Sequence, residues 1–186
     1  MADINSEIIR EQREHLRRIK RLEEVEKSGV IVPHLMQSDS TDQAIADITE
    51  EQVITFNTDV HHAGITRTSA SRFTIIMPGS YLLTFSAVAI ASVAGKKIAI
   101  WLKIGGVTIA NSSTYYTFKS ANANTVITVT FIEHFTAAQY FEFWMWGDHV
   151  GVKLDAIAEV ADNPGVTPNI PACPSIIMTA NYVGRD

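Results

Sequence analysis

Residues 73–90 constrain the fold more than any other stretch, because none of them is charged. Pro78 fixes φ near −65° and Gly79 accepts a positive φ, so the pair predicts a tight reversal between a short strand and a longer one. Successive side chains of the longer strand point to opposite sides of a sheet. One side carries Tyr81, Leu83, Phe85, Ala87 and Ala89, and the other carries Leu82, Thr84, Ser86, Val88 and Ile90. Because both sides are largely apolar, we expect a second sheet to cover one and another subunit to cover the other.

Further strand patterns follow along the chain, separated by turn residues. Gly105 and Gly106 permit the positive φ angles that a two-residue hairpin turn needs. Strands or hairpins are expected over residues 45–57, 73–90, 96–109, 125–133, 140–146, 150–160 and 175–183. About eight to ten strands without an internal repeat predict an all-β, antiparallel jelly-roll sandwich.

Residues 5–28 differ in composition from the rest, because Glu, Arg and Lys dominate and Gly and Pro are absent. Apolar residues recur at helical spacing, and the first part of the seam consists of Ile9, Leu16, Ile19 and Leu22. This pattern predicts a rod of roughly 36 Å at 1.5 Å per residue. A lone helix of this kind is marginal in water, and either a parallel bundle of identical helices or docking on another protein would stabilise it.

Residues 29–50 begin apolar and become polar, which predicts an extended arm lying on a neighbour rather than a free spacer. The residues that favour the arm include Val30, Val32 and Leu35, which water would solvate poorly. The predicted organisation is therefore a helix over 1–28, an arm over 29–50 and a jelly-roll domain over 51–186. Within that domain, His61 and His62 are expected in a loop.

The order Phe73, Pro78, Gly79, Tyr81, Phe85 resembles the jelly-roll domain shared by tumour necrosis factor and the globular heads of the first complement component. Further pieces fall in that family's order, at residues 54–57 with Gly64, 100–107, 125–146 and 175–183. The resemblance covers residues 38–186. It departs from the family at the Gly105-Gly106 turn, at residues 136–139 and in lacking a clear acidic calcium-binding cluster, so calcium binding is not carried over.

Charge and cysteine content narrow the function classes. A formal net charge of −5 gives no overall attraction to phosphate backbones, so nucleic acid is not an expected partner. The first residues lack the basic-then-apolar pattern of a secretory signal, and no run is long enough to span a membrane. The single cysteine, Cys173, cannot form an internal disulfide and is expected to be a small buried residue. These features fit synthesis in a reducing cytoplasm.

Candidate chemistry is sparse in the sequence. His61 and His62 are adjacent, and neighbours on a strand point apart, so they are poor ligands for one metal ion. The pairs Glu133-His134 and Asp148-His149 come without a recognisable nucleophile, and no hydrolase, metalloprotease or phosphate-loop motif is present. We therefore expect a protein that is not an enzyme and that uses no metal and no cofactor.

Two groups of aromatic residues are candidates for recognition. Trp101, Trp144 and Trp146 could line a sugar groove, but their position within strands favours the core or a subunit interface. The polar segment 111–124 carries the candidate ligand contacts Tyr115, Tyr116 and Phe118, for which packing over the end of the sandwich is the alternative.

The resemblance implies a tight homotrimer around aromatic sheet faces, for which we predict Tyr81, Phe85, Trp101 and Tyr182 at the trimer axis. A short helix, an arm and such a trimer suit a bacteriophage virion protein better than a secreted cytokine-like ligand or a carbohydrate-binding module. Within the virion, the short shaft favours a capsid decoration or cement protein that clamps the major capsid protein through its helix and arm. The alternative is a tail-fibre or spike tip that binds a host-surface receptor or glycan.

Overall fold

The computed structural model of the chain describes residues 14, 16, 17, 20, 32–161 and 169–185. The chain divides into two compact units, Met1–Val32 and Pro33–Asp186. In the first unit, the described residues Glu14, Leu16, Arg17 and Lys20 are helical. Leu16 is 56% exposed and Val32 57% exposed. The other positions predicted for attachment in this unit, Ile9, Ile19, Leu22 and Val30, lie outside the described residues.

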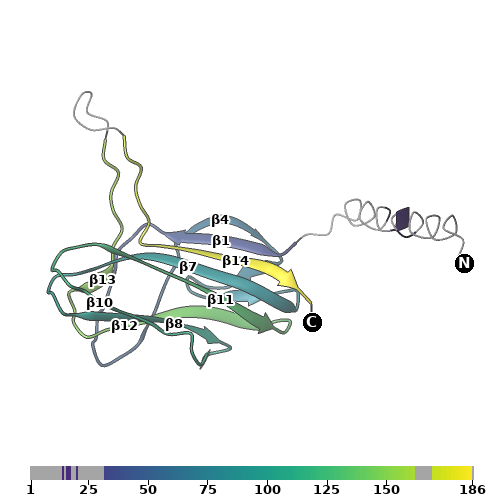
Figure 1. The fold of residues 1–186 in the computed structure, drawn as a ribbon, viewed down its shortest axis with the longest axis horizontal. Coiled ribbons are helices and arrows are strands. Elements are labelled where there is room, and N and C mark those ends of the chain that lie inside the picture. The colour runs from purple at the N-terminus through teal and green to yellow at the C-terminus, as the bar shows by residue number, and fades with distance from the viewer. Residues whose placement is uncertain (1–13, 15, 18–19, 21–31, 162–168, 186) are drawn as a thin grey trace, which may run out of the picture. The chain divides into compact units, whose positions relative to one another are not determined.

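The second unit is a sandwich of two antiparallel sheets (Figure 1). Sheet A has the order β2-β13-β7-β14-β1-β4, with β11 on the other side of β7. Sheet B has the order β10-β8-β12-β6-β5, and β3 and β9 add to β12 and β8. The strands are β1 (His34–Asp39), β2 (Gln43–Ala44), β3 (Gln52–Val53), β4 (Thr58–Ala63), β5 (Ile65–Arg67), β6 (Phe73–Ile75), β7 (Gly79–Ala91), β8 (Lys97–Ile104), β9 (Val107–Thr108), β10 (Thr114–Thr117), β11 (Thr125–Phe135), β12 (Tyr140–Gly147), β13 (Val152–Leu154) and β14 (Ile176–Gly184).

The core lies between the sheets and follows the alternation predicted for residues 81–90. Buried completely on the inner side of β7 are Tyr81, Leu83, Phe85, Ala87 and Ala89. Aromatic rings of sheet B meet them, and the ring centroids of Phe85 and Phe143 are 5.1 Å apart at an interplanar angle of 67°. Edge-to-face contacts of this kind add to the free energy gained from apolar burial. The prediction that residues 81–90 form one strand with two distinct sides is confirmed.

The predicted glycine turn at Gly105 and Gly106 is present, whereas Gly79 is the first residue of β7, and residues 76–78 carry the chain from sheet B to sheet A. Gly105 and Gly106 have φ of 59° and 82° and join β8 to β9. Gly79 has φ of 144°, and a Cβ placed there would lie 2.5 Å from Cε2 of Tyr182 and 2.6 Å from the carbonyl oxygen of Gly184. Gly79 therefore provides both the backbone angle and the space for β14 to close against β7.

The predicted arm over residues 29–50 is wrong from residue 33 onward. β1 lies within sheet A, paired with β14 on one side and β4 on the other. Leu35 is 2% exposed and belongs to the core rather than to an attachment surface. The inward positions of β1 also include Gln37 and Asp39, which are buried polar residues. Their polarity hid the strand pattern, because inward positions were expected to be apolar.

The prediction of a loop at His61 and His62 is wrong as well. Both residues lie in β4, which pairs with β1 at the edge of sheet A. Both histidines are exposed, and so are the two residues that precede them, Asp59 and Val60. An edge strand exposed on both sides has no apolar alternation, so the sequence did not mark it as a strand.

Two segments between β13 and β14 form a narrow excursion that we call the ribbon, made of residues 156–161 and 169–174. Antiparallel bridges join Ile157 to Cys173 and Val160 to Ile170. Figure 1 shows the ribbon leaving the sandwich and extending away from both sheets. A strand was expected as far as residue 160, but β13 ends at Leu154.

Candidate interaction surfaces

The outward side of sheet A carries no Asp, Glu, Lys or Arg over four neighbouring strands, and two histidines, His34 and His134, lie at one end of it. We call this surface the sheet A outer face, and it comprises Met36, Ser38, Leu82, Thr84, Ser86, Val88, Val126, Thr128, Thr130, Ile132, Ile177, Thr179 and Asn181. None of these side chains is an Asp, Glu, Lys or Arg. Val126 is 65% exposed and Ile132 66% exposed. A protein surface usually carries charges among its apolar atoms, so a broad uncharged face indicates an interaction site.

The strand register sets these side chains in straight rows across the face. One row runs from Met36 through Thr179 and Thr84 to Thr130. The hydroxyl oxygens of Thr84 and Thr130 are 3.0 Å apart, and those of Ser86 and Thr128 are also 3.0 Å apart. In each pair one hydroxyl donates to the other, so one of the two O–H donors already has a partner within the chain. Covering this face therefore costs less desolvation free energy than covering the same number of unpaired hydroxyls.

The outward side of sheet B, the sheet B outer face, has a different chemistry. Trp101 lies opposite Trp144, and Ala99 lies between Tyr115 and Trp146. The indole N–H of Trp146 donates to the carbonyl oxygen of Ile48 at 2.7 Å, which fixes that ring. This face combines half-exposed aromatic rings with charged groups.

Two charged pairs lie on the sheet B outer face. Nε of Arg72 lies 3.2 Å from Oε1 of Glu142, and Arg72 also stacks 3.9 Å from the ring centroid of Tyr140. Lys103 pairs with Glu51 and lies 4.0 Å from the ring centroid of Trp144. The two faces of the sandwich therefore suit different partners: sheet A a dry contact, and sheet B a polar or aromatic ligand.

The predicted trimer-axis set does not form one surface. Tyr81 and Phe85 are 0% exposed between the sheets, so their assignment to an interface is wrong. Trp101 is half-buried on the sheet B outer face, and Tyr182 packs 5.4 Å from the ring of Tyr81 at the end of β14. The physical reason is that the aromatic side chains of β7 fill the space between the sheets, while the threonine and serine hydroxyls of β7 face outward. A role for Trp101 or Tyr182 in assembly stays a prediction.

The aromatic residues of segment 111–124 also divide between the core and the surface. Tyr115 is 68% exposed on β10, and Phe118 is 2% exposed. Tyr116 packs edge-to-face on Phe118, with ring centroids 5.1 Å apart. Phe118 cannot contact an external ligand, because its ring is part of the core, so that assignment is wrong. Tyr115 keeps the exposure that a ligand contact needs.

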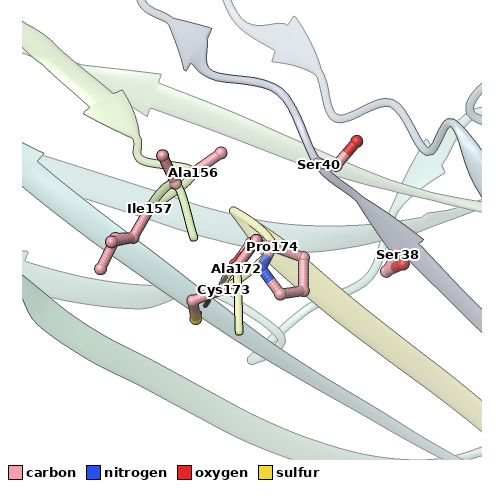
Figure 2. A pocket seen from close by; sticks show the side chains of 8 residues that line it. Ser38, Ser40, Ala156, Ile157, Ala172, Cys173 and Pro174 are labelled. Atoms are coloured by element: carbon pink, nitrogen blue, oxygen red, sulfur yellow. Dashed lines mark hydrogen bonds between the residues drawn. The ribbon is translucent and has the colours of Figure 1, made fainter. Parts of the chain in front are cut away.

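A pocket of about 340 Å³ lies between the end of β1 and the base of the ribbon. Figure 2 shows it lined by residues from three segments, namely Ser38 and Ser40, Ala156 and Ile157, and Ala172, Cys173 and Pro174. The lining is mostly apolar, with two serine hydroxyls at one side. Ser38 belongs to both the pocket and the sheet A outer face, so the two surfaces are continuous.

The Asp148–His149 pair makes structural hydrogen bonds to the backbone. Oδ1 of Asp148 accepts a hydrogen bond from the backbone N–H of Lys97 at 2.7 Å. Nδ1 of His149 accepts one from the N–H of Gly151 at 2.8 Å. Glu133 and His134 are neighbours on β11 and point to opposite sides of the sheet. In the described part of the chain, no group of three or more His, Cys, Asp or Glu residues is placed to hold a metal ion.

A small charged cluster secures the start of the ribbon. Nζ of Lys153 lies 2.7 Å from Oδ1 of Asp155 and also pairs with Asp42. The second oxygen of Asp42 accepts a hydrogen bond from the N–H of Ala156 at 2.9 Å. The hydrogen bond from Lys153, followed by that from Ala156, lowers the pKa of Asp42 below its usual value. The cluster fixes the direction in which the ribbon leaves the sheet.

Comparison with known proteins supports the fold. No family model and no curated protein matches the chain. The globular domain of zebrafish complement 1qA protein is similar in structure, with a TM-score of 0.51, 14% identity, and coverage of 83% of this chain and 98% of that one. Two structures of murine APRIL, at pH 5.0 and pH 8.5, give TM-scores of 0.53 and 0.51 and identities of 8% and 9%. Each covers 82% of this chain and 100% of the APRIL chain.

At these identities the likeness shows the fold alone. The chain folds as an antiparallel jelly-roll sandwich of the tumour necrosis factor type, which confirms the fold class expected from the sequence. Among the residues that the structure describes, no helix is long and apolar enough to cross a membrane.

Proposed function

We propose that this chain is a non-enzymatic, homotrimeric structural protein of a bacteriophage virion, with its jelly roll as the assembly unit and its N-terminal residues as the attachment unit. The observation that carries the proposal is the uncharged sheet A outer face. Its exposed Val126 and Ile132 and its paired hydroxyls suit a large, dry interface between copies of one chain.

The jelly-roll fold supports a closed trimer as the form of that assembly. Domains of the tumour necrosis factor and complement type commonly form homotrimers, which favours self-association through one sheet. A contact that joins one surface of a protomer to a different surface of the next closes into a ring when the rotation between them is a third of a turn. Burial of this face in the trimer adds to the stability of a protomer that also folds alone, so thermal unfolding of the trimer should depend on protein concentration.

Attachment to the shell is assigned to the first 32 residues. The chain divides between Val32 and Pro33, so these residues form a unit of their own outside the jelly roll. Their charged and apolar composition suits docking on another protein, and we propose the major capsid protein as that partner, which makes the chain a decoration or cement protein. The localisation is then the virion, after synthesis in the host cytoplasm.

Arginine substitution tests the assembly surface. Thr84→Arg and Thr130→Arg each place a charge at the centre of the sheet A outer face, while Thr117→Arg places the same charge at an exposed position on β10 as the control. Size-exclusion chromatography with light scattering should show trimers for the wild type and Thr117→Arg, and monomers for the other two. Trimeric Thr84→Arg and Thr130→Arg would contradict the proposal.

Shell binding tests the attachment unit. The full chain and a chain that begins at Pro33 are mixed with undecorated shells of the phage, and the shells are sedimented. The full chain should sediment with the shells, and the shorter chain should stay in the supernatant as a folded trimer. Equal binding of the two chains would overturn the assignment of residues 1–32.

A second candidate function is a tail-fibre or spike tip that binds a host-surface glycan. The specific observation for it is the sheet B outer face, where Tyr115 is 68% exposed in the row that contains Ala99 and Trp146. Aromatic faces of this kind give contact area at low entropic cost. Glycan-array binding that Tyr115→Ala abolishes, together with location at the tail of intact particles, would favour this function over shell decoration.

A further inference from the structure

We propose that the ribbon is an intersubunit clasp that packs on a second copy of this chain. The inference rests on the proposed self-association and adds a contact element that the sheet A outer face does not contain. The sequence patterns did not predict this element, because a strand was expected as far as residue 160.

The composition of the ribbon favours burial. Glu159 is its one charged residue, and most of the others are alanine, isoleucine, valine or proline. Ile157 is 40% exposed, Val160 41% and Ile170 49% within a single chain. A two-stranded excursion is marginally stable on its own in water, and apolar side chains exposed along it add to that cost. A protein surface that covers these side chains would stabilise the ribbon.

The base of the ribbon is held firmly, so it is preorganised for a partner. The N–H of Asp155 donates to the carbonyl oxygen of Val88 at 2.8 Å, where the first segment leaves β13. The N–H of Ser175 donates to the carbonyl oxygen of Asp39 at 2.8 Å, where the second segment returns to β14. Ser175 is fully buried. A fixed base lowers the entropy that is lost when the ribbon binds.

The position of the ribbon argues that the partner is another copy of the same chain. The pocket at its base is continuous with the sheet A outer face through Ser38. A neighbour seated on that face therefore meets the ribbon beside it. The ribbon and the face are alike in having almost no charge, so one dry interface can include both. The pocket, of about 340 Å³, offers room for an apolar side chain of the neighbour.

The single cysteine provides a probe for this contact. Cys173 lines the pocket and is partly exposed, and the chain has no other thiol. The rate at which a maleimide labels Cys173 is measured in the full-length wild type and in the Thr84→Arg monomer. We expect labelling of the assembled wild type to be slower by at least about tenfold, because the neighbour covers the pocket.

A substitution tests the apolar side chains directly. The full-length triple variant Ile157→Asn, Val160→Asn, Ile170→Asn should associate at least about tenfold more weakly than the wild type. Val107→Asn is the matched control, since Val107 is 68% exposed at the β8–β9 turn. It should associate as the wild type does.

The outcomes separate the clasp from the proposed function. If the wild type is trimeric but Cys173 is labelled equally fast in the trimer and in the Thr84→Arg monomer, and the triple variant associates normally, the clasp is overturned and the trimer stands. If the wild type stays monomeric at every concentration, the proposed self-association fails, and the clasp fails with it.

Discussion

Adjacent residues of β7 test which side of that strand is core and which is interface. Phe85 is 0% exposed, with ring centroids 5.1 Å from Phe143 and 6.3 Å from Phe131. Replacing such a phenylalanine by alanine removes its transfer free energy and leaves a cavity, which costs about 3–5 kcal/mol of unfolding free energy. For a domain of this size the melting temperature should fall by roughly 6–20 °C. Thr84 points the other way and loses one hydrogen bond to Thr130 on substitution, which is worth about 1 kcal/mol.

The assay separates folding from assembly by using Thr84→Arg as the monomeric background. Urea unfolding of Thr84→Arg and of Thr84→Arg/Phe85→Ala should differ by about 3–5 kcal/mol, with the same dependence on urea concentration. Phe85→Ala alone should remain trimeric as long as it stays folded. A Phe85→Ala chain that unfolds like the wild type but no longer forms trimers would refute the assignment of β7's two sides.

Three further predictions concern single positions. Gly79→Ala should destabilise the fold by about 1–3 kcal/mol, because φ is 144° there and the new Cβ meets Tyr182 at 2.5 Å; thermal unfolding measures it. Burial raises the pKa of Tyr81 to about 12, so this phenol contributes stability below its unfolded pKa of 10.0 that is lost as pH rises toward 12. Alkaline unfolding should therefore be shallower in Tyr81→Phe, and an unchanged profile would contradict the burial argument. The lowered pKa of Asp42 contributes stability above pH 3.8 that is lost as pH falls through the folded pKa. Asp42→Asn should be less stable at pH 7 and should lose less on acidification, as followed by circular dichroism.

The sequence predicted that the side chains of β7 alternate between two sides, but it did not predict which side faces the core. Both sets of side chains are largely apolar, so periodicity fixed that two sides exist without ranking them. The structure places the aromatic residues Tyr81 and Phe85 between the sheets, and the hydroxyl-bearing Thr84 and Ser86 outside. The family resemblance led us to assign the aromatic side of β7 to the trimer axis, although that side faces the core. A resemblance in residue order does not show which side of a strand faces inward.

Other differences have local physical causes. β1 was hidden because Gln37 and Asp39 occupy inward positions, where Gln37 donates to Asp59 at 2.7 Å and Asp39 accepts from Thr41 at 2.8 Å. Phe118 lies in a polar segment, yet its backbone pairs with Lys96 and its ring reaches the core. Local sequence patterns cannot predict contacts of this kind, because the partners are distant along the chain. One sequence signal could have revealed the sheet A outer face. The even-numbered residues of β7 are uncharged, and so are the alternate residues of β11 and β14 that pair with them.

Sedimentation equilibrium of the full-length wild type tests the central claim, that the sheet A outer face joins identical chains. Over a protein concentration of about 1–100 µM, we expect one species of about 61.5 kDa, three times the 20.5 kDa chain. Thr84→Arg run in parallel should sediment with the mass of a single chain. A wild type that stays at 20.5 kDa across the whole range would contradict the account.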